Sequence, residues 1–321
     1  MESIVRVAGL SHRYNKNWAI RDISFEIDKT SIYGLLGSNG AGKSTTMNIL
    51  CRVLNQTEGR VLINGIDTRR DPLKAKKQIG FLPQMPPLYM DLTVMEYLLY
   101  CARLREIKES LISVAVEEVM EKCNLLGVKQ RLLKNLSGGY RQRAGIAQAI
   151  IHKPKLVVLD EPTNGLDPVQ IVDVRNLIRE IAVERTVIFS SHILTEVQTL
   201  CQNILMIEHG KLFFSDSMDA FNNYVTPKSV FVEFENPPAP DALRSLKGVS
   251  RVETAGLKSF RVYSDEISIL HNVLVRASVD ADWNLNQLIL EKQSLDEVFQ
   301  LLSNTSFKNE HTAGNFITNT K

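Results

Sequence analysis

Residues 32–46 read Ile-Tyr-Gly-Leu-Leu-Gly-Ser-Asn-Gly-Ala-Gly-Lys-Ser-Thr-Thr, an apolar run that passes directly into a glycine-rich loop. The continuous apolar character of Ile32–Leu36 predicts a strand buried on both faces of a sheet. The loop fits the pattern G-x-x-x-x-G-K-S/T between a strand and a helix, where backbone N–H groups wrap a phosphate. Lys43 supplies a cation for phosphate oxygens, and the Ser44 hydroxyl is placed to hold Mg²⁺. The predicted phosphate-binding residues are Gly37, Ser38, Asn39, Gly40, Ala41, Gly42, Lys43, Ser44 and Thr45.

Two further apolar runs, Leu156–Leu159 and Thr186–Phe189, also predict central strands of a partly parallel sheet, and candidate catalytic residues follow both. Asp160 ends the first run, where open α/β sheets bind ligands, and its carboxylate can hold Mg²⁺. Glu161 is the candidate for polarising the attacking water. His192 follows the second run and can reach the same phosphate. Alone, an Asp-Glu pair is more often a solvated turn and a single histidine more often structural. The phosphate loop reverses the first interpretation, and the position of His192 at a strand end, 31 residues after Glu161 (192 minus 161), reverses the second.

Composition sets outer limits on the function. The chain has 321 residues, 44% hydrophobic and 23% charged, which is typical of a folded protein with room for about two domains. With a net charge of only +2, the chain has no strong positive field that would attract nucleic acid, so no nucleic-acid partner is expected. Four scattered cysteines without a C-x-x-C pair indicate neither zinc nor a redox motif, and favour a reducing cytosol. Because no run of 18 apolar residues occurs, any pore is expected to belong to another polypeptide.

The periodicity changes along the chain. The first 65 residues predict short strands with alternating faces, and residues 85–150 predict a helical subdomain inserted between sheet strands. Another helix is predicted after Asp167-Pro168, where Asp is a favoured cap and Pro suits the first turn. Within the helical insertion, the expected helices are 96–105, 111–123 and 141–150.

A second, smaller domain is predicted at 227–304, after a first domain that ends near residue 222. Its order of strand, helix, strand, strand, helix, strand is the ferredoxin-like pattern of an α+β domain. Ser294 and Glu297 predict a capping box for a final helix. The polar, aperiodic residues 305–321 predict a disordered tail.

Leu136-Ser137-Gly138-Gly139 lies 24 residues before Glu161 (161 minus 137) and adds a family resemblance. The phosphate loop, Phe81-Leu82-Pro83-Gln84, the LSGG segment, Asp160-Glu161-Pro162-Thr163, Asn164-Gly165-Leu166-Asp167 and His192 follow one another in that order. Residues 1 to about 220 therefore resemble the nucleotide-binding domain of the ATP-binding-cassette (ABC) family. The resemblance implies a P-loop NTPase ABC cassette, an α/β fold whose mixed sheet is joined by an antiparallel β subdomain and a helical subdomain.

The resemblance also implies roles for single residues. Gln84 would be the Q-loop glutamine, which touches Mg²⁺ and senses a membrane partner. Ser137, Gly138 and Gly139 would close on the γ-phosphate of ATP held by a second cassette, giving a head-to-tail homodimer or heterodimer. Asp167 would lie at that dimer seam, and His192 would be the switch histidine. Tyr14 matches the aromatic that stacks on adenine, although an aromatic in a β region is more often a packing residue.

The resulting hypothesis is an ATP-hydrolysing subunit that powers a separate integral membrane permease from the cytoplasmic face of the inner membrane. Short strings such as Ser190-Ser191-His192-Ile193-Leu194 and Ser294–Phe299 look like the ABC-2-type, exporter-associated cassettes. An importer subunit and a non-transport ABC ATPase remain alternatives, whereas a kinase or GTPase has no place for LSGG. Met85–Thr93 is interpreted as a permease-docking segment or as an ordinary surface turn. The transported substrate is not encoded in this chain's motifs.

Overall fold

A computed structural model describes residues 3–224, 229–264 and 266–291. The chain divides between Asp219 and Ala220 into two compact units, called unit 1 and unit 2 below, close to the boundary expected at 222–227. Helix α8 (Met218–Tyr224) contains this division. The final helix predicted from Ser294 and Glu297 and the predicted tail lie outside the described residues. In the described part of the chain, no helix is both long and apolar enough to span a bilayer.

Unit 1 begins with a small antiparallel sheet, as the alternating pattern of the first 65 residues predicts. Ile23, Phe25 and Ile27 are buried while the residues between them face solvent, so one face of this sheet packs on the core. The strands, in spatial order, are β2 (Asn17–Ile27), β1 (Val5–Tyr14), β4 (Glu58–Ile63) and β5 (Ile66–Asp67).

The larger sheet of unit 1 has six strands, and five of them run parallel. Every residue of its three central strands is buried, which explains why their sequences do not alternate. The three apolar runs found in the sequence are therefore confirmed as adjacent strands. The order across the sheet is β10 (Lys211–Ser217), β9 (Asn203–Glu208), β3 (Ile32–Leu36), β8 (Thr186–Ser191), β7 (Leu156–Asp160) and β6 (Ile79–Leu82).

One hydrophobic core cluster of unit 1 combines side chains from the two sheets with residues of helix α1 (Lys43–Leu50). Met47 and Leu50 on this helix belong to one buried cluster with side chains from both sheets. Cys51 is buried beside them and is 5% exposed. Further helices of unit 1 are α2 (Pro72–Lys77), α6 (Pro168–Ala182) and α7 (Leu194–Leu200).

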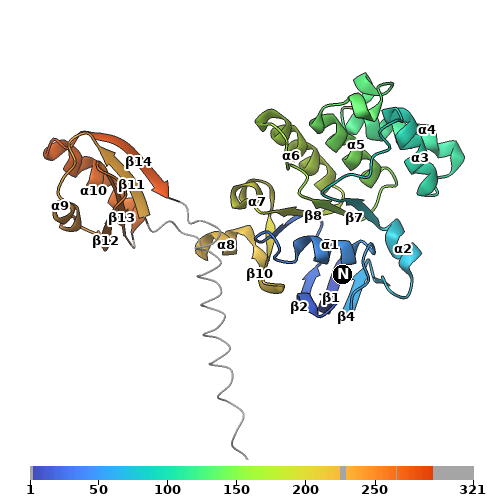
Figure 1. The fold of residues 1–321 in the computed structure, drawn as a ribbon, viewed down its shortest axis with the longest axis horizontal. Helices are drawn as coiled ribbons and strands as arrows, with labels where there is room; N and C mark the ends of the chain where they lie inside the picture. The colour runs from blue at the N-terminus through green and yellow to red at the C-terminus, as the bar shows by residue number, and fades with distance from the viewer. Residues whose placement is uncertain (1–2, 225–228, 265, 292–321) are drawn as a thin grey trace, which may run out of the picture. The chain divides into compact units, whose positions relative to one another are not determined.

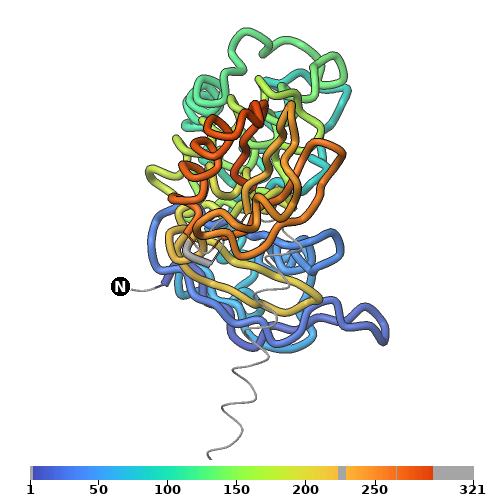
Figure 2. Tube along the Cα trace, turned by 90° about the vertical axis from the view of Figure 1, so that its left-hand side faces the viewer, coloured from blue at the N-terminus to red at the C-terminus, as the bar shows by residue number. Residues whose placement is uncertain are grey.

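The helical part of unit 1 lies at the opposite end from the antiparallel sheet, with the six-stranded sheet between them (Figures 1 and 2). Its first helix starts earlier than predicted because Thr93 and Glu96 form a reciprocal capping box. Its last helix also starts earlier, at Gly138, because the LSGG glycines form its first turn and not a loop. The helices are α3 (Val94–Leu104), α4 (Glu109–Lys122) and α5 (Gly138–Ile150), with short 3₁₀ turns at Leu126–Val128 and Leu133–Asn135.

In its described residues after α8, unit 2 forms an antiparallel four-stranded sheet with two helices. Val230, Val232 and Phe234 alternate along its first strand and are fully buried, so this face carries the core of the unit. The spatial order is β12 (Arg251–Thr254), β13 (Ser259–Tyr263), β11 (Ser229–Phe234) and β14 (Leu285–Glu291), and the helices are α9 (Pro240–Arg244) and α10 (Ile267–Asp280).

Candidate nucleotide-binding site

The candidate residues gather where three parallel strands end. Strands β3, β8 and β7 are neighbours, so their carboxyl ends meet at one edge of the sheet. Gly37 follows β3, Asp160 and Glu161 lie at the end of β7, and His192 follows β8. This edge is where open α/β sheets bind ligands.

The phosphate loop turns into α1 through Gly42. Gly42 has a φ of 109°, and a Cβ atom built there would lie 2.5 Å from Ile20 Cγ2. A side chain is therefore excluded both by the backbone conformation and by the neighbouring strand. The loop borders a cavity of about 230 Å³, lined by Ala19, Asn39, Gly40, Gly42, Lys43, Ser44, Thr45, Gln84 and Glu161.

Lys43 folds back onto its own loop. Its ammonium group donates hydrogen bonds to the carbonyl oxygens of Gly37 and Ser38, at 2.8 and 2.9 Å. The residue is only 6% exposed, and burial lowers the pKa of Lys43, while neighbouring carboxylates, Glu161 first among them, act in the opposite direction. The cation is thus held inside the loop, at the cavity that a phosphate would enter.

Glu208, at the end of β9, anchors the phosphate loop from the side. Its carboxylate accepts from the Ser38 backbone N–H at 3.0 Å and from the Ser38 hydroxyl at 2.5 Å. Glu208 was not among the residues predicted from the sequence, because it lies 170 residues from Ser38 and outside every motif. A polar residue at the end of another buried parallel strand was the signal that could have found it.

Asp160 is held by the neighbouring strand. Its side chain is almost fully buried, and the Ser190 hydroxyl donates to Asp160 Oδ1 at 2.5 Å. The same Ser190 oxygen accepts from the Glu161 backbone N–H at 2.9 Å. One serine on β8 thus holds the side chain of Asp160 and the backbone of Glu161, the residue that follows β7. Its position inside the Ser-Ser-His string did not reveal this role.

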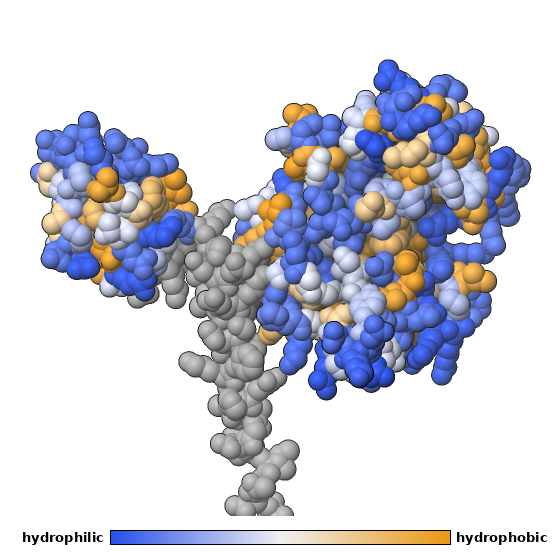
Figure 3. All heavy atoms as spheres, in the orientation of Figure 1, coloured by the Kyte–Doolittle hydropathy of each residue, from blue (hydrophilic) through white to orange (hydrophobic). Residues whose placement is uncertain are grey.

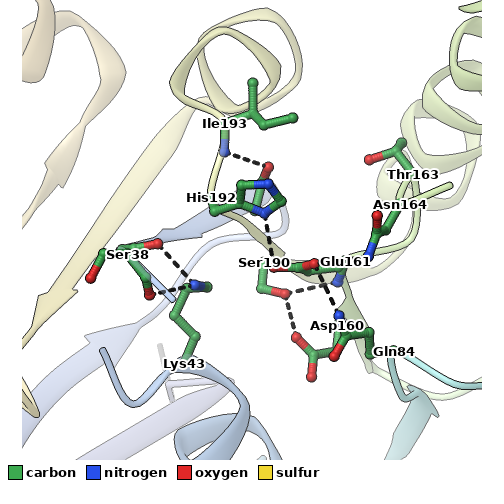
Figure 4. A network of polar contacts seen from close by, with 12 residues as sticks. Ser38, Lys43, Gln84, Asp160, Glu161, Thr163, Asn164, Ser190, His192 and Ile193 are labelled. Carbon is green, nitrogen blue, oxygen red and sulfur yellow. Dashed lines mark hydrogen bonds and ion pairs between the residues drawn. The ribbon is translucent and has the colours of Figure 1, made fainter. Parts of the chain in front are cut away.

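Glu161 occupies a left-handed backbone conformation with a φ of 47°, which is uncommon outside glycine and costs on the order of 1–3 kcal/mol. Its carboxylate lies among three polar side chains (Figure 4). His192 Nδ1 is 3.0 Å from Oε1, whereas Gln84 Nε2 and Asn164 Nδ2 donate to Oε2 at 3.2 and 3.3 Å. The structure therefore brings the sequence candidates Gln84, Glu161 and His192 into direct contact.

The LSGG residues do not line this cavity. Ser137 is the N-cap of α5, and Gly138 and Gly139 form its first turn. A Cβ atom on Gly139 would lie 2.7 Å from the Gln170 side chain, so α5 packs tightly against the start of α6. Asp167 is the N-cap of α6 and accepts from the Gln170 N–H at 2.9 Å. The predicted cap is thereby confirmed, and the LSGG and Asp167 segments lie side by side.

Tyr14 is also absent from the cavity lining among the described residues. It ends β1, is 51% exposed, and its ring packs edge-on against His12 at a centroid distance of 4.7 Å. Ala19, on the paired strand β2, does reach the cavity. The hairpin therefore borders the site, with the Tyr14 ring available on its surface.

The oxygen groups predicted to hold a metal are a side-chain hydroxyl on Ser44, an amide on Gln84 and a carboxylate on Asp160. Among the described residues, no three His, Cys, Asp or Glu side chains cluster as an all-protein metal centre. Magnesium usually takes one or two protein oxygens together with substrate phosphates and water. Oxygen donors beside a phosphate loop fit that mode of binding.

Comparison with known proteins agrees with this geometry. The ABC transporter family model matches residues 20–164. An uncharacterized ABC transporter ATP-binding protein of Bacillus subtilis, YdbJ, is 33% identical over 93% of this chain and 94% of its own length. The chain belongs to the ABC transporter family. It is an ATP-binding subunit with the ATPase cassette of that family, as the sequence predicts.

Two further relatives extend the comparison with this ABC ATPase. The bacitracin transport ATP-binding protein BcrA of Bacillus licheniformis is 36% identical, over 66% of this chain and 69% of its own. The solved structure of cbiO1 from Clostridium perfringens, part of the ABC transporter complex cbiONQ, superposes with a TM-score of 0.64. It is 25% identical and covers 70% of this chain and 92% of its own. The predicted α/β cassette with an antiparallel subdomain is thus confirmed.

Proposed function

We propose that this ABC ATPase hydrolyses ATP at the phosphate-loop cavity and thereby drives an exporter. The observation that carries the proposal is the placement of Glu161 at the edge of that cavity. Asp160 is tied to Ser190, whereas Glu161 points to His192, so the two carboxylates are held for different tasks. A carboxylate near the metal, but not on it, is the group expected to polarise the attacking water.

The remaining roles follow from the same arrangement. The backbone N–H groups of residues 37–45 and Lys43 would bind the ATP phosphates. Ser44, Gln84 and Asp160 would hold Mg²⁺, which supplies charge neutralisation at the β and γ oxygens. The Ser190 hydroxyl donates to Oδ1 of Asp160 and leaves Oδ2 outside that hydrogen bond. The second oxygen supports the assignment of Asp160 as a ligand of Mg²⁺. His192 would contact the γ-phosphate, and Tyr14 would stack on adenine.

Hydrolysis requires a second cassette in this proposal. Ser137 and Gly138 are exposed at the start of α5, whose N-terminal end attracts anions, yet they do not line the chain's own cavity. The phosphate loop and the LSGG segment are thus two separate half-sites. A complete site would form if Ser137–Gly139 of one subunit closed on the ATP held by the other. Asp167, packed next to them, would lie at the same seam.

The test uses Glu161→Gln, which keeps the size of the side chain but removes its charge. With ATP and Mg²⁺, the variant should lose hydrolysis and accumulate as a dimer in light scattering. Glu117→Gln, an exposed change on α4, is the matched control and should hydrolyse ATP like the wild type. A Glu161→Gln chain that stays monomeric, even with its membrane partner, would contradict the ATP-sandwich dimer.

The permease is proposed to dock beside the Q-loop. A groove of about 730 Å³ runs between helices α1, α2 and α3, and Pro83 and Pro87, which flank Gln84, line it. Hydrophobic side chains on the visible face of unit 1 lie among hydrophilic ones (Figure 3). Met85 and Tyr89 are 85% and 54% exposed, so the docking interpretation of Met85–Thr93 is favoured over an ordinary turn. Gln84 directly precedes this segment and also donates a hydrogen bond to Glu161. In this proposal, Gln84 therefore links permease docking to ATP hydrolysis.

The exporter assignment is supported by the similarity to the bacitracin transport subunit. The subunit would then sit at the cytoplasmic face of the inner membrane, held by a permease encoded as a separate chain. Affinity purification of the full chain from membranes should recover an integral membrane protein. Recovery of ribosomes or DNA without any integral protein would favour the non-transport alternative. Reconstituted vesicles then separate export from import by the direction of ATP-dependent transport.

Unit 2 is proposed to be a ferredoxin-like domain. Its chain order is strand, helix, strand, strand, helix, strand, and its first strand, β11, lies between β13 and β14 in the sheet. The hairpin strand β12 is at one edge and the last strand, β14, at the other. This is the arrangement expected when two strand-helix-strand halves interleave.

A further inference from the structure

Glu196 is a buried carboxylate outside the phosphate-loop site. It lies in the first turn of α7 and is 5% exposed. Its Oε2 atom accepts from the Thr163 hydroxyl at 3.0 Å and from the Ser191 hydroxyl at 2.9 Å. Its Oε1 atom accepts from Arg175 on α6 at 3.2 Å. Three separate segments thus converge on one side chain.

The partners of Glu196 stand next to the candidate catalytic residues. Thr163 comes two residues after Glu161, and Ser191 comes directly before His192. The Ser191 hydroxyl also accepts from the Ile193 N–H at 3.0 Å, so both sides of His192 are tied to it (Figure 4). Thr163, near Glu161, and Ser191, next to His192, both donate to Oε2 of Glu196. These two hydrogen bonds therefore flank the contact between His192 and Glu161.

A buried charge is a costly way to join segments. Removing a carboxylate and a guanidinium from water carries a desolvation penalty that apolar packing avoids. The Glu196–Arg175 pair is nevertheless almost enclosed, with side-chain exposures of 6% and 21%. What the carboxylate provides, and an apolar side chain does not, is a fixed direction for two hydroxyl groups at once.

We propose that Glu196 is a positioning residue for hydrolysis, and this inference rests on the proposed roles of Glu161 and His192. It holds the segment after β7 and the end of β8 at a fixed separation, so that His192 and Glu161 meet. Through Arg175, it also ties both segments to α6, the helix that Asp167 caps. Glu196 is not within the ATP cavity and has no contact with the phosphate loop among the described residues. Its loss is expected to affect the rate of hydrolysis and not the affinity for ATP.

The test exchanges Thr163, because Glu196→Ala would leave Arg175 buried without its carboxylate and confuse unfolding with misplacement. Thr163→Val keeps the shape of the side chain but removes the hydroxyl, whereas Thr163→Ser keeps the hydroxyl. The full chain, alone and with its co-purified membrane protein, is assayed for ATP turnover and for binding of a fluorescent ATP analogue. Thr163→Val should lower kcat by on the order of 10- to 100-fold with unchanged ATP affinity, and Thr163→Ser should stay within about twofold of the wild type.

A Thr163→Val chain with wild-type kcat would overturn the inference. So would a variant whose ATP affinity falls while kcat is kept, because Glu196 would then act on binding. A purely structural role would lower the thermal midpoint without separating the two variants in kcat. If the wild type itself hydrolyses no ATP, the proposed function has failed and not the positioning role.

Discussion

The neutral form of His152 makes unit 1 sensitive to mild acid. Its ring nitrogen Nε2 lies 3.1 Å from the Ile79 carbonyl oxygen, which can only accept, so Nε2 carries the proton. Nδ1 is buried and has no hydrogen-bond partner among the described residues. Burial lowers the pKa of His152 from 6.5 to about 4, and the Arg105 guanidinium acts in the same direction. A proton on Nδ1 is therefore strongly disfavoured in the folded state.

The sign and size of the effect follow from this difference in pKa. Above pH 6.5, the ring is neutral in both the folded and the unfolded chain, so His152 does not make the free energy of unfolding depend on pH. As the pH falls, the unfolded chain takes up the proton first, so stability is lost between pH 6.5 and 4. The loss attributable to His152 is about 2 kcal/mol at pH 5 and approaches about 3 kcal/mol below pH 4.

The assay is urea unfolding at pH 7.5 and 5.0, followed by tryptophan fluorescence. The chain has two tryptophans, so Trp283→Phe leaves Trp18 as the reporter of unit 1. In that background, the change from pH 7.5 to 5.0 should lower the free energy of unfolding of His152→Gln by about 2 kcal/mol less than that of the parent. His209→Asn, at an exposed position, should behave like the parent. An identical pH dependence of His152→Gln and its parent would show that His152 is not the source of the acid sensitivity.

Two further changes probe local structure. Thr93→Ala removes the capping box of α3 and should lower the free energy of unfolding by about 1 kcal/mol in the same urea assay, whereas Thr93→Ser should retain most of it. Gly42→Ala places a Cβ atom 2.5 Å from Ile20 in a left-handed conformation, so binding of a fluorescent ATP analogue should be lost. Gly127→Ala, where a Cβ meets open space, should bind normally; equal binding by both alanine variants would contradict the steric argument.

Much of the cassette could be predicted because its information is local. Each central strand is one continuous apolar run, and Gly37, Glu161 and His192 each follow directly after one of these strands. Neighbouring parallel strands end at the same edge of a sheet, so the residues that follow them lie close together. Helix starts were less predictable: Gly138 has a low helix propensity, yet the packing of α5 against Gln170 outweighs that preference.

The parts that could not be predicted depend on partners far apart in the chain. Glu208 and Ser38 are 170 residues apart, and Glu196 and Thr163 are 33 apart. No periodicity or motif connects such pairs, because their contact is created only when the sheet is assembled. Glu161 shows the same limit: its sequence position indicates a carboxylate at a strand end, but its left-handed backbone is a property of the folded edge.

If phosphate binds at this loop as proposed, the two hydrogen bonds from Lys43 to its own loop would make ligand entry an exchange reaction. Two neutral carbonyl acceptors, on Gly37 and Ser38, hold the ammonium group until anionic oxygens replace them. A ligand therefore gains only the difference between a charged and a neutral acceptor. Adenosine offers no replacement and leaves the lysine where it is, whereas a diphosphate completes the exchange. In the proposed phosphate-binding role, the loop would therefore distinguish phosphorylated from unphosphorylated ligands by competition for Lys43.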